Sequence, residues 1–298
     1  MSVLRVPSKF TLGTVQLGMN YGMANQTGKP SREEAFEVLN TAWDVGVRSL
    51  DTAVAYGDSE KVIGEYLKES KKPYFVASKF SIKGENPREE LLLQVEHTRK
   101  YLESVDLYMF HSAEQLSLYG KELEEELCSF QESGLTKSLG ASIYEAKDIE
   151  TVLQHDWLSA IQLPMSILDT RIIESGFLDE LHKRGVQVFV RSVFFQGLLC
   201  MEKAPEKYYF LEPYLNELRE VAKAEQMTLM ELAISFIRDL PSVNSVVLGC
   251  ESAKQVRTNS VMMNCKDISA KGKAQILEIG RRIPSERAMN IVLGREVQ

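Results

Sequence analysis

Residues 47–80 read VRSLDTAVAYGDSEKVIGEYLKESKKPYFVASKF, and this stretch decides the fold. The short run VRSLDTA predicts a strand. The run SEKVIGEYLKES has apolar residues at helical spacing, and PYFVASKF predicts a second strand. A strand, a helix and a strand in this order predict two parallel strands joined by a helical crossover.

The same alternation extends in both directions along the chain. On the N-terminal side, FTLG predicts a first strand, and residues 31–46 predict a helix with Ser31 as N-cap, Glu34 three residues later and Gly46 at the end. On the C-terminal side, strands are expected at VDLYMFH (105–111), TKSLGAS (136–142), SAIQLPM (159–165), VQVFVRS (186–192) and SVNSVVLG (242–249). Helices are expected at 87–104, within 121–134, and at 146–154, 171–185, 212–227, 229–240 and 252–263.

Eight such strands favour a closed (β/α)8 barrel over an open doubly wound sheet. No strand is followed by GxGxxG, the turn with which a Rossmann fold holds a dinucleotide. No linker or composition break interrupts residues 1–298, which predicts one domain. Residues 266–298 predict a terminal helix and a tail, SERAMNIVLGREVQ.

Composition limits the classes of function. Of the 298 residues, 44% are hydrophobic and 26% charged, which is typical of a soluble protein with a sizeable core, and the net charge of −7 argues against nucleic-acid binding. No apolar run approaches a membrane span, and the N-terminus has no signal-peptide core. The four scattered cysteines predict reduced thiols in the cytoplasm, and the few, isolated histidines predict no metal site. The oligomeric state stays open.

Four polar residues stand at or just past the ends of the first predicted strands: Asp51, Tyr56, Lys79 and His111. In a parallel barrel these ends converge on one face, where barrel active sites lie. An acid, a phenol, an amine and an imidazole brought together there could deliver a proton to a carbonyl oxygen.

The order of these residues resembles the aldo-keto reductases, in which DTAxxYGxSExxxG is followed by a strand-end Lys and a strand-end His. The resemblance runs from about Phe10 to about Asn259. It implies an NADP(H)-dependent oxidoreductase that reduces an aldehyde or ketone to the alcohol. Tyr56 would be the general acid/base, and Lys79 would lower its phenol pKa.

In this assignment Asp51 would keep the Lys79 ammonium charged and oriented, and neutral His111 would orient the carbonyl oxygen by a hydrogen bond.

The resemblance also implies contacts to the nicotinamide. Gly13 and Thr14 match the first-strand turn beneath the ring, and Ser142 and Gln162 match the positions that bind the carboxamide. Ile143 stands where many members have Asn. Arg191 stands where many members stack an aromatic ring, and a guanidinium plane can also stack; Ser192 follows it in the same loop.

The loop after the eighth predicted strand leads into a helix N-terminus, which suits an anion. Candidates for the phosphate and adenosine end of the cofactor are Gly249, Cys250, Ser252, Gln255 and Asn259. The Lys and Arg that bind the 2′-phosphate in well-studied relatives are absent at Gly249 and Gln255, but Lys254 and Arg257 flank the turn. We therefore expect NADPH to be preferred and NADH to be usable.

Two other functions are compatible with the sequence. One is a non-catalytic nicotinamide-binding sensor or channel subunit of the same fold. The other is an unrelated barrel, an isomerase or lyase, in which Lys79 forms a Schiff base. The substrate is not identified, although the polar loop LGMNYGMANQTGKPS (17–31) suits a hydroxylated compound such as a sugar derivative.

Overall fold

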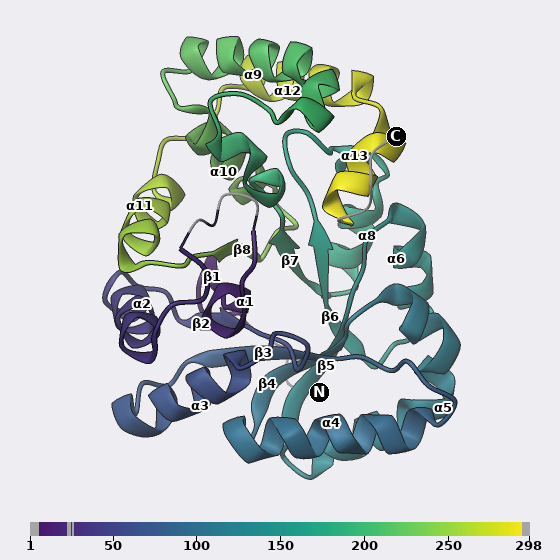
Figure 1. The fold of residues 1–298 in the computed structure, drawn as a ribbon. Coiled ribbons are helices and arrows are strands. Elements are labelled where there is room, and N and C mark those ends of the chain that lie inside the picture. Colours follow the sequence, from purple (N-terminus) through teal and green to yellow (C-terminus); the bar gives the residue numbers. More distant parts are fainter. Residues whose placement is uncertain (1–5, 23–24, 26, 294–298) are drawn as a thin grey trace.

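Eight parallel strands form a closed barrel at the centre of the computed structural model, which describes residues 6–22, 25 and 27–293 (Figure 1). The strands follow one another around the barrel in chain order, and the last pairs with the first. They are β1 (Phe10–Gly13), β2 (Ser49–Asp51), β3 (Phe75–Phe80), β4 (Val105–Phe110), β5 (Thr136–Ser142), β6 (Leu158–Pro164), β7 (Gln187–Arg191) and β8 (Ser245–Gly249). The (β/α)8 barrel expected from the sequence is confirmed.

Helices surround the barrel. Those that follow strands directly or cover the outside are α1 (Val15–Gly18), α2 (Arg32–Asp44), α3 (Ser59–Ser70), α4 (Pro87–Leu102), α5 (Ala113–Glu132), α6 (Ala146–Val152), α7 (Arg171–Glu174), α8 (Phe177–Lys183), α9 (Glu212–Ala224), α10 (Leu229–Arg238) and α11 (Ala253–Met263). Two 3-10 turns, η1 (Phe195–Cys200) and η2 (Glu206–Leu211), follow β7, and α12 (Ala270–Arg282) and α13 (Ser285–Val292) end the described chain. None of the helices in the described residues is long and apolar enough to cross a membrane.

Local signals in the sequence explain where several helices begin. Helix α2 starts at the expected capping box, in which the Ser31 hydroxyl accepts a hydrogen bond from the Glu34 amide and the Glu34 carboxylate accepts one from the Ser31 amide. Pro87 occupies the first turn of α4, where its missing N–H leaves no partner unsatisfied.

Three expectations about the helices are wrong in detail. The helix expected at 171–185 is broken into α7 and α8 at Gly176, whose φ of 78° lies in the left-handed region. The segment after Lys266 holds two helices, α12 and α13, rather than one helix and a tail; residues 294–298 of that tail lie outside the described residues. Helix α5 begins at Ala113, well before the expected 121, because Ser112 caps it.

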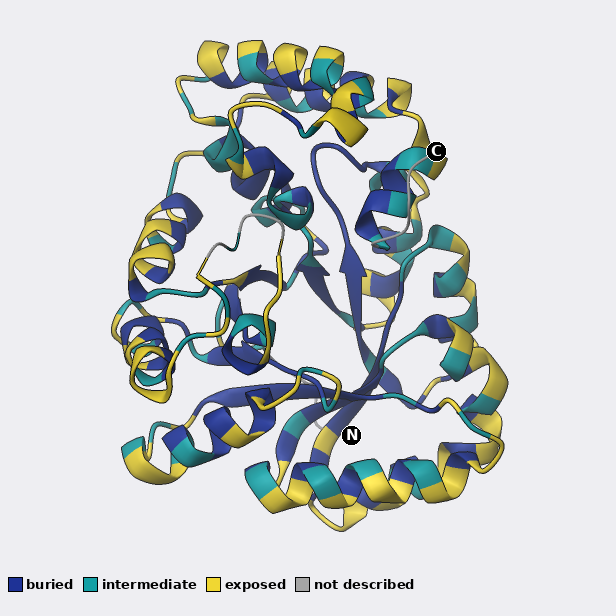
Figure 2. Ribbon diagram, in the orientation of Figure 1, coloured by how far each residue is buried: buried dark blue, intermediate teal, exposed yellow. Residues whose placement is uncertain are grey.

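The core has two parts, one between the strands and the helices and one inside the barrel. In Figure 2 the strands at the centre are coloured mostly as buried. Outward-facing strand side chains pack against the buried faces of the helices. Inward-facing side chains fill the barrel itself: Phe75 of β3 stacks on Phe189 of β7 across the interior, with ring centroids 6.3 Å apart. The barrel is therefore a filled core and not a pore.

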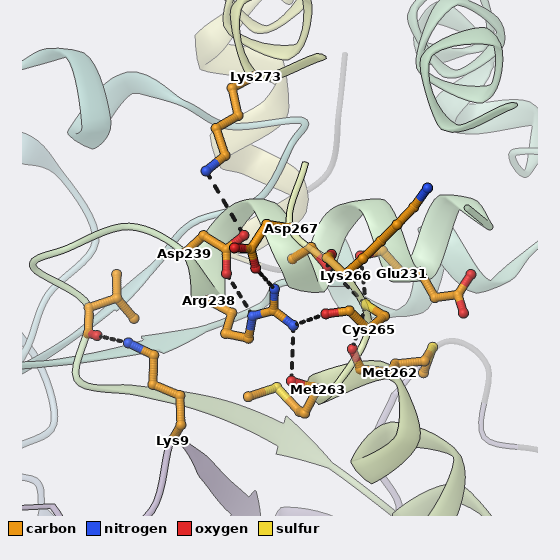
Figure 3. Close-up of polar contacts among 12 residues, drawn as sticks. Lys9, Glu231, Arg238, Asp239, Met262, Met263, Cys265, Lys266, Asp267 and Lys273 are labelled. Carbon is orange, nitrogen blue, oxygen red and sulfur yellow. Dashed lines mark hydrogen bonds and ion pairs between the residues drawn. The ribbon is translucent and has the colours of Figure 1, made fainter. Parts of the chain in front are cut away.

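The end of the barrel where the strands begin is held by a network around Arg238, the last residue of α10 (Figure 3). Its guanidinium donates to Asp239 at 2.7 Å, to the Cys265 carbonyl at 2.6 Å and to the Met263 carbonyl at 3.0 Å. Lys9, just before β1, donates to the carbonyl of Val243 near β8. These contacts fix helix α10 and the connection between α11 and α12, away from the opposite end where the candidate site lies.

Candidate active site

Strand geometry brings the predicted site residues to one place, the barrel mouth, by which we mean the C-terminal ends of the eight strands. Side chains alternate along a strand, and Phe75, Ala77, Leu107, Met109 and Phe189 all face the interior. Lys79, His111 and Arg191 share this parity, each lying two residues beyond an interior side chain. They therefore point into the mouth above the filled core.

A buried ion pair lies at the centre of the mouth. The Lys79 ammonium donates to the Asp51 carboxylate at 2.7 Å and to the Thr52 carbonyl at 2.8 Å, and the two charged side chains are 1% and 6% exposed. The amide nitrogen of Gln162 donates to the same carboxylate oxygen at 2.6 Å. Burial lowers the Lys79 pKa, and the Asp51 charge and hydrogen bond oppose this shift.

Tyr56 lies over this pair on the loop between β2 and α3, with its ring centroid 5.0 Å from the Lys79 nitrogen. Its position depends on close backbone packing: a Cβ at Gly18 would lie 1.8 Å from the Tyr56 carbonyl oxygen. The Ser59 amide donates to that same oxygen at 3.1 Å. Only glycine fits at position 18, so the first-strand loop sets the position of the phenol.

His111, directly after β4, completes the tetrad of Asp51, Tyr56, Lys79 and His111. Its ring stands edge-on to Tyr56, with centroids 5.8 Å apart and planes at 79°. Burial, followed by the charges of Lys79 and Arg191, lowers its pKa to about 3, so the imidazole is neutral near pH 7. The Nδ1 atom is buried and makes no hydrogen bond within the described part of the chain.

The expected effect of Lys79 on the phenol is not the dominant one in this structure. Burial raises the Tyr56 pKa well above its ordinary value, the Asp51 charge raises it further, and the Arg191 charge lowers it. The side chain is partly exposed, but its surroundings disfavour the charged phenolate. The expectation of a lowered phenol pKa is therefore wrong for the protein alone, and Tyr56 holds its proton near pH 7.

Most of the chain matches one known family. The model of the aldo/keto reductase family matches residues 9–280. The chain belongs to the aldo/keto reductase family. Its relatives include L-glyceraldehyde 3-phosphate reductase of Escherichia coli O157:H7, 26% identical over 92% of this chain and 89% of the relative. A second relative is NADH-specific methylglyoxal reductase of Escherichia coli strain K12, 26% identical over 86% of this chain and 90% of that protein.

A solved aldo/keto reductase shows the same fold. The holo form of aldo-keto reductase AKR11C1 from Bacillus halodurans superposes with a TM-score of 0.77 over 93% of this chain and 95% of that chain, at 22% identity. Relatives of this aldo/keto reductase thus act on small carbonyl compounds, and the family uses nicotinamide cofactors.

The carboxamide-binding positions expected in this aldo/keto reductase lie side by side. Ser142 of β5 and Gln162 of β6 are register partners, and both side chains are buried. The Gln162 amide nitrogen donates a hydrogen bond to Asp51, whereas the buried amide oxygen has no hydrogen-bond partner among the described residues. An unpaired buried acceptor at the mouth is costly unless a ligand donates to it, so the site fits a carboxamide NH2.

Other predicted cofactor residues play supporting roles. The Thr14 hydroxyl donates to the Asp51 carbonyl at 2.7 Å and also bonds Ser59 at 2.8 Å, so it braces the strand that carries Asp51. Gly13 faces Gly249 across the β1–β8 pair, where a Cβ would lie 3.3 Å from the Gly249 backbone. Ser192 lies in the loop directly after β7 and has a φ of 61°, an uncommon value for a residue with a side chain.

The turn from β8 into α11 separates its predicted residues into two groups. Cys250 and Asn259 are buried against each other, with the Asn259 amide donating to the Cys250 sulfur at 3.2 Å, so their side chains pack the turn from inside. Ser252 caps α11, and Gln255 is bonded to the Glu251 amide at 2.8 Å and to its carboxylate at 2.9 Å. Lys254 is exposed on the first turn.

Two residues at the mouth were missed by the sequence analysis. The Gln16 side chain lies over Gly249, where a Cβ would come within 2.6 Å of its amide nitrogen, and its buried amide oxygen has no partner in the described residues. Tyr144 lies under the Arg191 guanidinium, 4.3 Å from the ring centroid. Only the position of Gln16 directly after the first-strand turn, and of Tyr144 just after β5, could have indicated them.

Proposed function

We propose that this protein reduces an aldehyde or ketone to the alcohol with hydride from NAD(P)H, and that Tyr56 gives the proton to the carbonyl oxygen. The observation that carries the proposal is the buried Lys79–Asp51 pair directly beneath Tyr56, with His111 beside it. A phenol, a fixed ammonium and a neutral imidazole around one point can bind a carbonyl oxygen and protonate it.

The residues of the tetrad divide this work. Tyr56 and the N–H of neutral His111 donate hydrogen bonds to the carbonyl oxygen and hold it in place. As negative charge develops on that oxygen, the phenol proton moves to it, and the resulting phenolate is stabilised by the Lys79 ammonium. Asp51 keeps Lys79 oriented through the 2.7 Å bond.

A bound nicotinamide dinucleotide would supply the hydride that adds to the carbonyl carbon. Gln162 would accept a hydrogen bond from its carboxamide through the unpaired amide oxygen, with Ser142 beside it, and the face of Arg191 would stack on its ring. The N-terminus of α11, with Gly249, Ser252 and Gln16, would hold the phosphate and adenosine end.

We propose that NADPH is preferred and NADH is usable, and that Lys254 is the main cation that binds the 2′-phosphate of NADPH. Arg257 supports this choice less than expected, because its guanidinium contacts Thr41 of α2 at 3.4 Å. The Glu251 carboxylate stands in the same turn and opposes a 2′-phosphate, so we propose a small preference.

The substrate of the proposed reaction is a small carbonyl compound, and a hydroxylated one suits the first-strand loop. The described residues Asn20, Tyr21, Gly22, Asn25 and Gly28 of that loop line a cavity of about 370 Å³. Tyr21 lies close enough to Tyr56 to raise its pKa, so this loop borders the tetrad. The expected loop also contains residues 23, 24 and 26, which lie outside the described residues.

The C-terminal segment contributes to the same mouth in our proposal. Gln196, in the loop after β7, donates to the Val292 carbonyl of α13 at 3.0 Å, and Arg171 of α7 contacts the Met289 sulfur. We propose that α13 covers one side of the substrate pocket.

The four free cysteines support the cytoplasmic setting expected from the sequence.

The two alternatives gain no support from this geometry. The Lys79 amine is fully buried and bonded to Asp51 and Thr52, which leaves it no approach to a substrate carbonyl for a Schiff base. A non-catalytic sensor of this fold can keep an intact tetrad, so measured turnover separates it from the proposed reductase.

The test is oxidation of NADPH and NADH, followed by absorbance, against a panel of aldehydes, keto-sugars and quinones. Tyr56→Phe keeps the ring but removes the proton donor, so turnover should fall by at least about 100-fold. Cofactor affinity, measured by titration of nucleotide fluorescence, should stay nearly unchanged. Turnover close to that of the wild type in Tyr56→Phe would refute the assignment.

A further inference from the structure

Arg191 carries a positive charge at the barrel mouth, and no residue in the described part of the chain neutralises it. It is the last residue of β7 and is half-buried. Within the described residues its guanidinium makes two hydrogen bonds, both long, to the Ile143 carbonyl at 3.4 Å and to the Ser192 hydroxyl at 3.5 Å. Among residues 6–22, 25 and 27–293, no carboxylate forms an ion pair with it.

Three of the other half-buried arginines in the described chain, Arg171, Arg219 and Arg238, hold a carboxylate, whereas Arg48 and Arg287 do not. Arg171 holds Asp169 through two hydrogen bonds of 2.7 and 2.8 Å, and Arg238 holds Asp239 at 2.7 Å. A half-buried guanidinium without a carboxylate is costly to maintain, because burial weakens its hydration without supplying a counter-charge. A ligand that brings a negative charge would relieve this cost.

The position of Arg191 directs its charge at the tetrad. Its side chain points into the mouth by the alternation of β7, and its face lies on Tyr144. Its charge lowers the pKa of Tyr56, Lys79 and His111, so it is close to all three. Asp51 compensates Lys79, whereas Arg191 has no carboxylate partner of this kind among the described residues.

We propose that Arg191 binds an anionic group of the substrate, a carboxylate or a phosphate ester, and thereby selects carbonyl compounds that carry a negative charge. The inference rests on the proposed function and names its substrate class. A guanidinium offers five N–H donors in a planar fork that matches carboxylate and phosphate oxygens. Aromatic rings stack on the flat face of the guanidinium, whereas the anion would bind to the N–H groups at its edge.

The first experiment compares matched substrates with saturating NADPH: glyceraldehyde 3-phosphate against glyceraldehyde, and succinic semialdehyde against butyraldehyde. We expect the anionic member of at least one pair to have the higher kcat/KM. Arg191→Gln should lower kcat/KM for that member roughly 10- to 100-fold, mainly through KM, as for loss of a charged hydrogen bond. Both members of a pair lose the proposed stacking of Arg191 on the nicotinamide alike, so kcat/KM of the anionic member should fall about 10-fold further than that of the neutral member.

Two further variants control for charge and fold. Arg99→Gln removes an exposed arginine of α4 that has no carboxylate partner among the described residues, and it should leave the preference unchanged. Arg191→Lys keeps the charge but loses the fork, so it should restore part of the preference. Equal losses for anionic and neutral substrates in Arg191→Gln would overturn the proposal, as would a wild type that does not prefer the anionic member of either pair.

The second experiment does not depend on turnover. Calorimetry measures the binding of glycerol 3-phosphate and of succinate to the protein saturated with NADPH. Neither compound has an aldehyde or ketone group, so NADPH cannot reduce them during the measurement. Wild type should bind at least one anion roughly 10-fold more tightly than Arg191→Gln. Equal binding would overturn the inference even if carbonyl reduction is observed, whereas absence of reduction with intact anion binding would overturn only the proposed function.

One other source of the anion is the cofactor itself. If Arg191 bound a cofactor phosphate, Arg191→Gln would weaken NADPH binding and leave the substrate preference intact. That outcome would also refute the proposal.

Discussion

Replacing Lys79 by Met tests whether the buried ion pair stabilises the folded protein in addition to supporting catalysis. The change removes hydrogen bonds of 2.7 Å to Asp51 and 2.8 Å to the Thr52 carbonyl. The Asp51 carboxylate then stays buried with Gln162 as its only side-chain donor in the described residues. Loss of one partner from a buried pair costs about 3–5 kcal/mol, so the melting temperature should fall by roughly 10 °C.

A second variant separates stability from catalysis. Asp51→Asn combined with Lys79→Met removes both charges, so no isolated charge is left in the core. Its free energy of unfolding should recover to within about 2 kcal/mol of the wild type. Activity should stay low in both variants, because the tetrad acts as a unit and the losses from Asp51→Asn and Lys79→Met are far from additive.

The measurement is urea unfolding followed by circular dichroism, together with carbonyl reduction. Lys137→Met is the matched control: its ion pair with Asp106 has the same 2.7 Å separation, but the lysine side chain is 78% exposed. Its loss should cost less than about 1 kcal/mol. The reasoning fails if Lys79→Met costs no more than Lys137→Met, or if the double variant is less stable than Lys79→Met.

The remaining predictions concern pH and the cofactor. The folded pKa of His111 is about 3 and its unfolded value about 6.5, so between these values only the unfolded chain binds the proton and stability falls as pH falls. This group contributes at most about 1.4 kcal/mol to the free energy of unfolding per pH unit. The free energy of unfolding of His111→Gln should therefore fall less steeply than that of the wild type between pH 6 and pH 4. If the two proteins lost stability in parallel over this range, the prediction would be contradicted. The ratio of kcat/KM for NADPH over NADH should exceed one, fall in Lys254→Ala and rise in Glu251→Gln, with NADH turnover little changed. A wild-type ratio at or below one would overturn the NADPH preference.

The sequence was informative wherever a local rule decides the structure. Strand alternation and the order of the four polar residues were enough to predict the barrel and to bring Lys79 and His111 to one mouth. The Ser31–Glu34 pair was enough to place the start of α2. Such features depend on a few neighbouring residues or on a period of two, and both can be read from the chain.

Expectations that depended on three-dimensional surroundings were less accurate. The pKa of Tyr56 depends on burial by distant segments, which no local pattern records. Arg257 lies next to the proposed cofactor turn in sequence, but its side chain reaches α2, and Gln16 lies over Gly249 although the two are far apart in the chain. The break at Gly176 was missed because glycine is compatible with a helix as well as with the left-handed turn that ends it.

The pairing of β1 with β8 has a consequence for how the protein is made. Phe10 pairs with Val246, so the barrel cannot close until residue 246 has left the ribosome. Until then the growing sheet has two unpaired edges, and one of them is the strand synthesised first. Exposed edges of this kind promote association with other chains. A chain truncated before β8 would therefore keep β1 as an open sheet edge, and it should aggregate more readily than the chain that contains β8.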